Sequence, residues 1–262
     1  MSLKFNNLDN VSLDDLEADS EFIPLMTSED EEALEKEKLP EVLPILPLIN
    51  TVLFPGVVIP INAGRDKSIK LIQDANKSNK LIGVVAQKKK STENPGIDDI
   101  FHIGTVAKIL RVLKMPDGNT TIIIQGKKRF KIKTVVKEEP YIQATVDDII
   151  DKLPKKLSNK FTATIDAIKD VALKIIKENP NIPSEASFAI KNINSSSFLI
   201  NFVSSNMNIG IIDKQGLLSM TNVQDRATEC LKKLNLEYEK LALKNDIQSK
   251  VRSDIDQQQR EY

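Results

Sequence analysis

The hydrophobic pattern of this 262-residue chain changes its period near residue 150, and this change limits the folds that it can adopt. Between residues 42 and 150, short runs rich in Ile, Val and Thr alternate with turn residues, which is typical of half-buried strands. The predicted strands are Val42–Leu48, Val57–Ile61, Leu81–Gln87, Thr105–Lys114, Thr120–Gly126, Phe130–Val136 and Tyr141–Asp147. One helix, Arg65–Lys77, is predicted among them. A single helix argues against parallel β-α-β winding and favours a closed or sandwiched, mostly antiparallel β domain.

The clearest turn signal in this region is the segment Lys114–Asn119. Pro116 presets its own φ angle, and the following Asp117-Gly118 pair accepts a left-handed backbone at little cost. Because strand-like runs flank the segment on both sides, it predicts a β-hairpin.

After Asp151 the apolar residues follow a helical spacing. The predicted helices are 155–178, Ser184–Lys191, Ser196–Ser205, Asp213–Ser219 and Asn222–Tyr262, and Ser184 and Asp213 are expected to be N-caps. The last helix contains no Gly or Pro and reaches residue 262 without a stop signal, so we expect it to be cut in mid-helix. The fold class is therefore α+β, with a β domain at 42–150, a helical bundle at 151–221 and a long helix at 222–262.

Charge is distributed unevenly along the chain, although 37 basic and 37 acidic residues balance in total. Residues 1–41 hold thirteen acidic and three basic side chains, and the remainder holds 34 basic and 24 acidic ones. The first segment has no sustained apolar period, so it is predicted to be a disordered, solvated tail. A tail that screens the basic body or binds a partner is the alternative.

Residues suited to catalysis or to metal binding are scarce. His102 and Cys230 are the only histidine and cysteine, which excludes a multi-histidine metal site, a zinc finger and a disulfide. Gly126-Lys127 is the only Gly-Lys pair, and it lacks the other residues of a phosphate-binding loop. We therefore predict no catalytic residue, no metal site and no cofactor in this chain, and we assign Cys230 to the core of a helix bundle and His102 to a structural position.

Targeting signals are also missing from the sequence. No uninterrupted apolar run approaches the roughly 20 residues of a membrane-spanning helix. The acidic N-terminus lacks the basic-then-apolar order of a secretory signal, and a single cysteine suits a reducing compartment. We expect a cytoplasmic protein that does not contact a membrane.

Two basic runs, Lys88–Lys90 and Lys127–Arg129 with Lys131 and Lys133 after it, are compatible with nucleic-acid binding. Only Phe130 is interleaved with them, and the RNP-like aromatic pattern is missing. A solvated strand face and loop explain these lysines better.

An unusual feature is the apolar turn at Asn50–Val58, where Leu53 and Phe54 lie beside Pro55-Gly56. These side chains are expected either to tuck under the β domain or to be exposed for contact with another chain.

Several motifs, in this order, resemble the N-terminal region of the ATP-dependent Lon protease family. They are Leu46-Pro47-Leu48, Phe54-Pro55-Gly56-Val57-Val58-Ile59-Pro60, Gly64-Arg65-Asp66-Lys67-Ser68-Ile69, Val85-Ala86-Gln87-Lys88, Gly104-Thr105-Val106-Ala107, Pro116-Asp117-Gly118, Gly126-Lys127-Lys128-Arg129-Phe130 and Gln258-Gln259-Arg260-Glu261-Tyr262. The resemblance covers roughly residues 43–262 and is strongest up to about residue 150.

This resemblance implies a PUA-like β domain, a helical bundle and a long helix that enters a homohexamer. It implies that this region selects unfolded or degron-bearing proteins and supports oligomerisation. ATP, Mg²⁺ and the serine–lysine peptidase chemistry are expected only in domains beyond Tyr262, so the chain itself is expected to be non-catalytic. A stand-alone PUA-like binding protein, with nucleic acid as one possible ligand, is the alternative.

Two sets of residues are candidates for these functions. We expect Leu53, Phe54 and Val57 to be partly exposed and to contact substrate, because a binder of unfolded chains must keep apolar surface accessible. We expect Leu234, Tyr238 and Leu241 to mediate oligomerisation, because a helix of this length exceeds what a small bundle requires.

Overall fold

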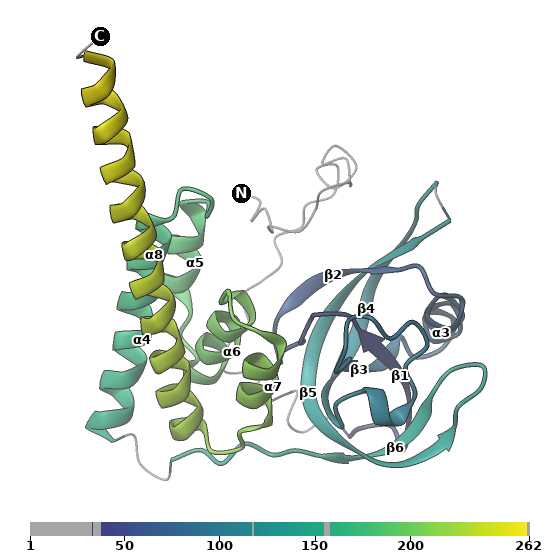
Figure 1. Cartoon of the computed structure of the whole chain (residues 1–262). Coiled ribbons are helices and arrows are strands. Elements are labelled where there is room, and N and C mark those ends of the chain that lie inside the picture. The colour runs from purple at the N-terminus through teal and green to yellow at the C-terminus, as the bar shows by residue number, and fades with distance from the viewer. Residues whose placement is uncertain (1–32, 34–37, 117, 155–157, 261–262) are drawn as a thin grey trace.

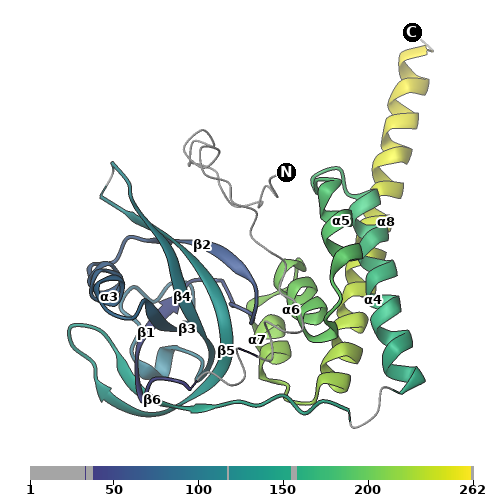
Figure 2. The same ribbon diagram turned by 180° about the vertical axis from the view of Figure 1, so that it is seen from behind.

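The computed structural model describes residues 33, 38–116, 118–154 and 158–260. The tail predicted for residues 1–41 falls almost entirely outside these residues. Figures 1 and 2 show a β domain and a helical domain packed side by side, with the last part of the final helix projecting away from both. The α+β class predicted from the sequence is confirmed.

Six strands within the described part form one mixed sheet. They are β1 (Val42–Leu48), β2 (Val58–Ala63), β3 (Leu81–Ala86), β4 (Ile103–Lys114), β5 (Thr120–Lys137) and β6 (Gln143–Asp148). The strand order is β2-β5-β4-β3-β1-β6, and a further pairing of β5 with β6 closes five of the strands into a barrel. The pair β1–β3 is parallel and every other strand pair is antiparallel, so the mostly antiparallel character was predicted correctly.

Strand β5 departs from the prediction, since the two strands expected at Thr120–Gly126 and Phe130–Val136 form one continuous strand. The basic run Lys127–Arg129 stays within the strand, where Arg129 pairs with Thr105 of β4, instead of separating two strands. It can do so because Lys128 is paired with Asp148 of β6 while Phe130, directly after the run, is fully buried. The predicted hairpin at 114–119 is present, since Lys114 pairs with Thr120 and Gly118 has φ +88°.

Helix α3 (Asp66–Lys77) covers one face of the barrel, and a short 3₁₀ turn follows later at Ile97–Asp99. Leu71, Ile72 and Ala75 form the buried stripe of α3 at helical spacing. They join Leu46 of β1 and Ile82 of β3 in one apolar cluster. The helix is therefore held against the barrel by its apolar face.

Five helices form the second domain within the described residues. They are α4 (Asn159–Glu178), α5 (Glu185–Asn192), α6 (Ser196–Asn206), α7 (Ile211–Ser219) and α8 (Val223–Arg260). Ser158 and Ser195 cap α4 and α6, because their hydroxyls accept hydrogen bonds from the backbone N–H groups of Phe161 (3.1 Å) and Phe198 (3.0 Å). Helix α4 lies along α8, and α7 rests against β4.

The N-cap assignments made from the sequence are only partly right. Helix α7 begins at Ile211 with the extended residue Gly210 before it, so the assignment of Asp213 as its N-cap is wrong. Asp213 lies inside the first turn, where its negative charge interacts favourably with the positive end of the helix dipole. It also forms an ion pair with Lys233 at 2.7 Å. Ser184 does precede α5, but its hydroxyl makes no capping hydrogen bond because its backbone is already helical.

The tight contact between β3 and β4 generates a prediction about glycine. A Cβ atom on Gly104 would overlap the Val84 carbonyl oxygen and lie 2.7 Å from Val85 Cγ1, whereas a Cβ on Gly216 of α7 would meet nothing within 4 Å. We expect Gly104→Ala to lower the free energy of unfolding by about 3 kcal/mol, because backbone atoms cannot yield to the new methyl group. Gly216→Ala should raise it by about 0.5–1 kcal/mol through better helix propensity. Urea unfolding followed by circular dichroism measures both, and equal effects would contradict this packing.

Candidate functional site

The apolar turn at residues 50–58 lies at the junction of the two domains. The side chains of Leu53, Phe54 and Val57 are only 2%, 0% and 4% exposed. Phe54 and Val57 belong to the same apolar cluster as the buried residues of α4, α6 and α8. The expectation that these three residues are partly exposed is therefore wrong, because the helical domain covers the turn. The alternative, that they tuck under the β domain, describes them better.

Hydrogen bonds fix this turn in both domains. The Thr105 hydroxyl of β4 donates to the Leu53 carbonyl oxygen at 2.6 Å, and the Gly56 N–H donates to the Gly126 carbonyl oxygen at 2.9 Å. From the helical side, Asn201 of α6 donates from Nδ2 to the Pro55 carbonyl oxygen at 3.3 Å. The turn is thus a joint between the domains, and the side chains of Leu53, Phe54 and Val57 are not accessible to a substrate.

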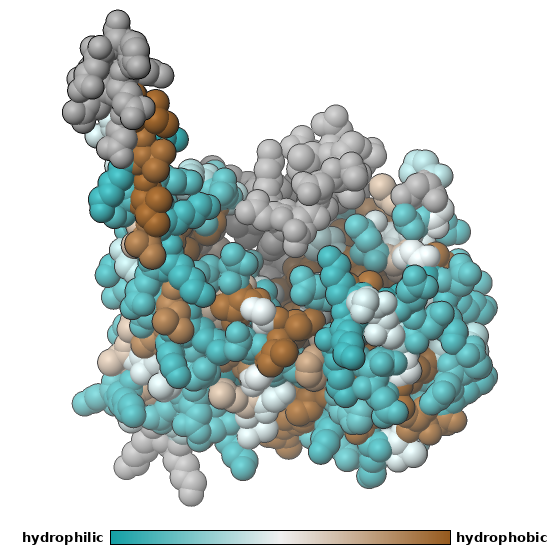
Figure 3. Space-filling view, in the orientation of Figure 1, coloured by the Kyte–Doolittle hydropathy of each residue, from teal (hydrophilic) through white to brown (hydrophobic). Residues whose placement is uncertain are grey.

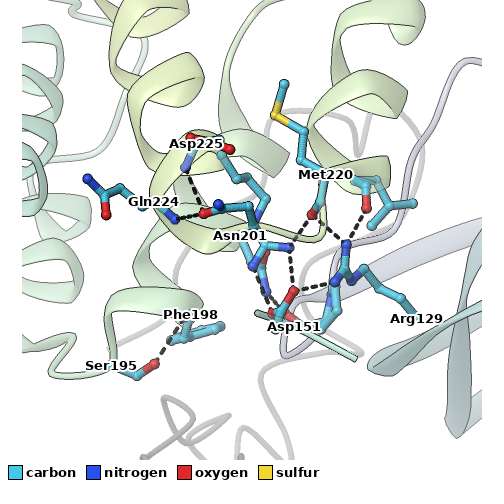
Figure 4. Close-up of polar contacts among 12 residues, drawn as sticks. Arg129, Asp151, Ser195, Phe198, Asn201, Met220, Gln224 and Asp225 are labelled. Atoms are coloured by element: carbon cyan, nitrogen blue, oxygen red, sulfur yellow. Dashed lines mark hydrogen bonds and ion pairs between the residues drawn. The ribbon is translucent and has the colours of Figure 1, made fainter. Parts of the chain in front are cut away.

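A buried ion cluster forms the polar part of the same junction (Figure 4). Asp151, in the segment between β6 and α4, forms ion pairs with Arg129 of β5 and with Arg226 of α8, the latter at 2.9 Å. Arg129 Nη1 also donates to the carbonyl oxygens of Leu218 (2.7 Å) and Met220 (2.8 Å), at the end of α7. The two arginine side chains are only 2% and 1% exposed. The Asp151 carboxylate therefore connects the barrel to α8, and Arg129 connects the barrel to the end of α7.

Burial lowers the pKa of Arg129 to about 10, against the opposing effect of the nearby Asp151 carboxylate. The neighbouring charge of Arg226 is a second, smaller cause of this lowering of the Arg129 pKa. Arg129 still carries its proton at neutral pH, so the cluster holds two positive charges and one negative charge.

The three residues proposed for oligomerisation face the interior of the helical domain. Leu234 is buried, and Tyr238 and Leu241 pack against the same apolar cluster. The Tyr238 hydroxyl donates to Glu178 Oε1 at 2.9 Å, which raises the pKa of Tyr238. Because α4 of the same chain packs along this face of α8, Leu234 is covered within the chain, whereas Tyr238 and Leu241 remain partly exposed.

A different face of α8 is exposed. Leu243, Ile247, Val251 and Ile255 recur every four residues and are 60%, 52%, 51% and 48% exposed. Figure 3 shows them as a column of hydrophobic atoms on the projecting part of the helix. We call these four residues the outer stripe. The four-residue spacing of the stripe is visible in the sequence. The buried face of the same helix shows a longer apolar repeat, so the sequence predicts the contact role for that face.

A groove between α4 and α5 is the second apolar surface. It has a volume of about 530 Å³ and is lined by Leu173 and Ile176 of α4, by Ile182 of the connecting loop and by polar residues of both helices. Lys177 and Lys191 give its rim a positive charge. Phe188, one helical turn from both Ser184 and Lys191 of this lining, is 69% exposed. We call this surface the α4–α5 groove.

The basic run of β5 is partly neutralised by acidic neighbours. Lys128 pairs with Asp148 at 2.6 Å, and Lys133 lies 3.4 Å from Asp147, both on β6. Arg129 belongs to the buried cluster. This arrangement weakens the case for a nucleic-acid surface, because a phosphate backbone would have to compete with these carboxylates.

The remaining candidates for chemistry have structural roles. Cys230 is fully buried in the helical domain, and burial raises the pKa of its thiol to about 11, which confirms its assignment to the core. His102 is exposed, and its Nε2 lies 3.3 Å from the Ile97 carbonyl oxygen. Within the described part of the chain no group of His, Cys, Asp or Glu could hold a metal ion, and no helix is long and apolar enough to cross a membrane.

These features define, over residues 38–116, 118–154 and 158–260, an α+β protein that exposes apolar side chains on α5 and α8. A family model described as the ATP-dependent protease La (LON) substrate-binding domain matches residues 42–235. The chain therefore belongs to the Lon substrate-binding domain family, as the resemblance of its motifs suggested.

Similar proteins agree with this family. The chain is 62% identical over 259 residues to a Lon protease of Flavobacterium johnsoniae. This alignment covers 99% of this chain and 32% of the relative. It is 50% identical over 242 residues to a Lon protease of Cytophaga hutchinsonii, covering 92% of this chain and 30% of that protein. The chain thus spans about a third of the length of these relatives.

Solved structures resemble the fold. The N-terminal domain of Mycobacterium avium complex Lon protease matches 74% of this chain and 98% of its own, with a TM-score of 0.61 and 19% sequence identity. The Lon N-terminal domain protein from Xanthomonas campestris matches 73% of this chain and 97% of its own, with a TM-score of 0.52 and 15% identity. At these identities the likeness shows a shared fold.

The ion cluster generates a prediction about stability. We expect Asp151→Asn to lower the free energy of unfolding by about 3 kcal/mol, because it leaves two buried guanidinium groups without a counter-charge. Asp213→Asn is the matched control, since its pair with Lys233 is half exposed on the Asp213 side, and it should cost less than about 1 kcal/mol. Chemical denaturation compares the two variants. Equal losses would mean that the cluster contributes no more than a surface pair.

Proposed function

We propose that this chain is the substrate-recognition and oligomer-supporting N-terminal part of a Lon protease, an ATP-dependent serine protease that degrades misfolded and short-lived regulatory proteins. In this proposal the chain itself is non-catalytic and acts in the cytoplasm. ATP, Mg²⁺ and peptide cleavage belong to further domains of the whole protein, as the length of the similar proteins suggests. Its partners are unfolded or degron-bearing proteins and other copies of itself.

The observation that carries the recognition role is the α4–α5 groove with Phe188 beside it. A binder of unfolded chains gains affinity by removing apolar surface from water, at about 25 cal/mol per Å². The groove provides such surface on a framework that is already folded, so little entropy is lost from the binder on association. Its two lysines favour apolar segments that lie close to acidic residues.

The oligomer-supporting role is assigned to the outer stripe of α8. Beyond Asn245, which donates to the carbonyl oxygen of Glu178 at the end of α4, the helix projects away from the rest of the described chain. Four large apolar side chains, each about half exposed, are a costly surface for an isolated helix. Contact of this stripe with a second copy, or with the equivalent helix in a larger ring, would remove it from water.

The recognition role predicts that Phe188→Ser weakens binding of a reduced, alkylated, permanently unfolded protein by about tenfold, through the loss of about 1.4 kcal/mol of apolar contact. Ile212→Ser is the matched control, because Ile212 is 75% exposed and lies on α7, away from the groove. Fluorescence anisotropy measures both affinities. Equal weakening in the two variants would contradict the assignment of the groove, and salt-sensitive RNA binding in place of protein binding would favour the stand-alone alternative.

The oligomer role predicts that the double variant Ile247→Asp, Val251→Asp weakens self-association by at least about tenfold, because it places charge in the outer stripe. Ser249→Asp adds a charge to another face of the same helical turn and should leave association unchanged. Analytical ultracentrifugation measures the association constants, and circular dichroism verifies that the helix persists. A wild-type chain that stays monomeric at all concentrations would contradict this role for the stripe.

A further inference from the structure

The α4–α5 groove has a positive rim that its acidic neighbours neutralise only in part. Its lining contains Lys177 and Lys191 and, among the described residues, no acidic side chain. Both lysines are exposed, and neither forms an ion pair within the described part of the chain. Glu178 accepts a hydrogen bond from the Tyr238 hydroxyl of α8, so Glu185 of α5 is left to offset part of the rim charge. Such a rim favours a ligand with acidic residues.

Between the two lysines the groove is apolar. Leu173, Ile176 and Ile182 line it and are only partly buried, so part of each side chain is accessible to a ligand. Phe188, beside the lining, is 69% exposed. A volume of about 530 Å³ holds a few large side chains and is too small for a folded partner. The complementary ligand is therefore a short polypeptide segment that places a few apolar side chains next to acidic ones.

The chain contains a segment of this composition before its first strand. Residues 14–35 include ten acidic and no basic side chains. Within them lie four large apolar side chains in close succession, Phe22, Ile23, Leu25 and Met26. The acidic run 29–32 begins after two further residues. We call residues 22–32 the acidic segment. Its apolar group and its acidic run complement the apolar floor and the positive rim of the groove.

The acidic segment is long enough to reach the groove of its own chain. Leu39 packs against an apolar cluster of the β domain, and the helical domain lies directly beside that domain (Figure 1). The thirteen peptide units between Met26 and Leu39 extend over at most about 45 Å. This length matches the diameter of about 45 Å expected for a compact body of this size. Attachment to the same chain also gives the segment an effective concentration on the order of 1 mM, so a weak contact is sufficient to fill the groove.

We propose that the acidic segment docks in the α4–α5 groove of its own chain and competes there with polypeptide substrates. The apolar group at residues 22–26 covers the apolar floor and Phe188, and the acidic run at residues 29–32 lies against Lys177 and Lys191. This inference rests on the proposed function of the groove, to which it adds regulation by the chain itself. A substrate must displace the segment, so weakly apolar polypeptides are excluded and strongly apolar ones are accepted.

The docking is tested directly with a nitroxide spin label in the 262-residue chain. Cys230 is fully buried, so a label reacts selectively with the cysteine introduced by Ser20→Cys. We expect this label to broaden the NMR amide signals of residues 184–191 of α5, and the same label on Ser2→Cys to broaden them at least about threefold less. A spin-labelled chain mixed with an isotope-labelled chain that carries no nitroxide should show no broadening.

The charge contact is tested with two matched pairs of lysines in the same labelled chain. Lys177→Gln with Lys191→Gln should reduce the broadening at least about twofold, because the rim loses the charges that face the acidic run. Lys67→Gln with Lys70→Gln removes two half-exposed lysines from α3 of the barrel and should leave the broadening unchanged. Equal effects of the two pairs would mean general attraction to a basic body and would overturn the contact with the groove.

Competition is tested by binding of a reduced, alkylated, permanently unfolded protein, measured by fluorescence anisotropy. Phe22→Ser with Ile23→Ser should strengthen this binding at least about threefold, because the groove is no longer filled from within the chain. Leu3→Ser with Phe5→Ser is the matched control, since it removes two apolar side chains that lie outside the acidic segment. This control should leave the affinity unchanged.

Three further results would overturn the proposal. Equal broadening at residues 184–191 from the labels at residues 20 and 2 would exclude docking of the acidic segment in the groove. Broadening that appears only in the mixture of two chains would assign the contact to a second copy. Unchanged affinity in the Phe22→Ser, Ile23→Ser variant would exclude competition. Because Phe188→Ser tests the groove itself, weaker substrate binding in that variant without any effect of the N-terminal variants would leave the proposed function standing while this inference fails.

Discussion

The contact of Asp151 with Arg129 and Arg226 holds the two domains in one arrangement. The three residues come from β5, from the segment between the domains and from the start of α8, and they meet where the apolar turn of the β domain enters the helical domain. The apolar cluster at this junction supplies most of the favourable free energy of packing the two domains together, because it removes large side chains from water. The ion cluster contributes orientation, since buried arginine groups tolerate few geometries in which their hydrogen bonds are made. Arg226 Nε is buried without a hydrogen-bond partner among the described residues, and this unpaired donor offsets part of the stabilisation from the cluster.

This junction determines which surfaces remain for binding. Because the turn with Phe54 is used to join the domains, the β domain does not present it to a partner. The helical domain instead exposes the α4–α5 groove at one side of α4, while the other side of α4 packs along α8. Helix α4 therefore connects the groove to the long helix.

Local patterns in the sequence predicted the helices and strands themselves better than the residues against which they pack. The β-branched runs, the Pro116-Asp117-Gly118 turn and the helical spacing after Asp151 located nearly every strand and helix, because these signals depend on neighbours within a few residues. The joining of two predicted strands into β5 was missed, since a lysine run reads as a turn when its strand partners are unknown. The ion cluster was missed for a similar reason, as Asp151 and Arg226 are 75 residues apart and each looks like a surface charge. Exposure of Phe54 was mispredicted because the helices that cover it follow about a hundred residues later.

The long helix α8 carries two apolar faces, and the sequence alone does not show what each of them contacts. Its inner face, with Leu234 and Tyr238, follows the steps of three and four residues that suit packing along another helix. That face ends where α4 ends, at the hydrogen bond between Asn245 and Glu178. The outer stripe lies on a different side of the helix and runs from Leu243 to Ile255, and Leu236, seven residues earlier on that same side, is already 49% exposed. The exposed apolar row therefore runs beside the packed face and continues past the end of α4, and this continuation, rather than the length of the helix, is the physical argument for an assembly role.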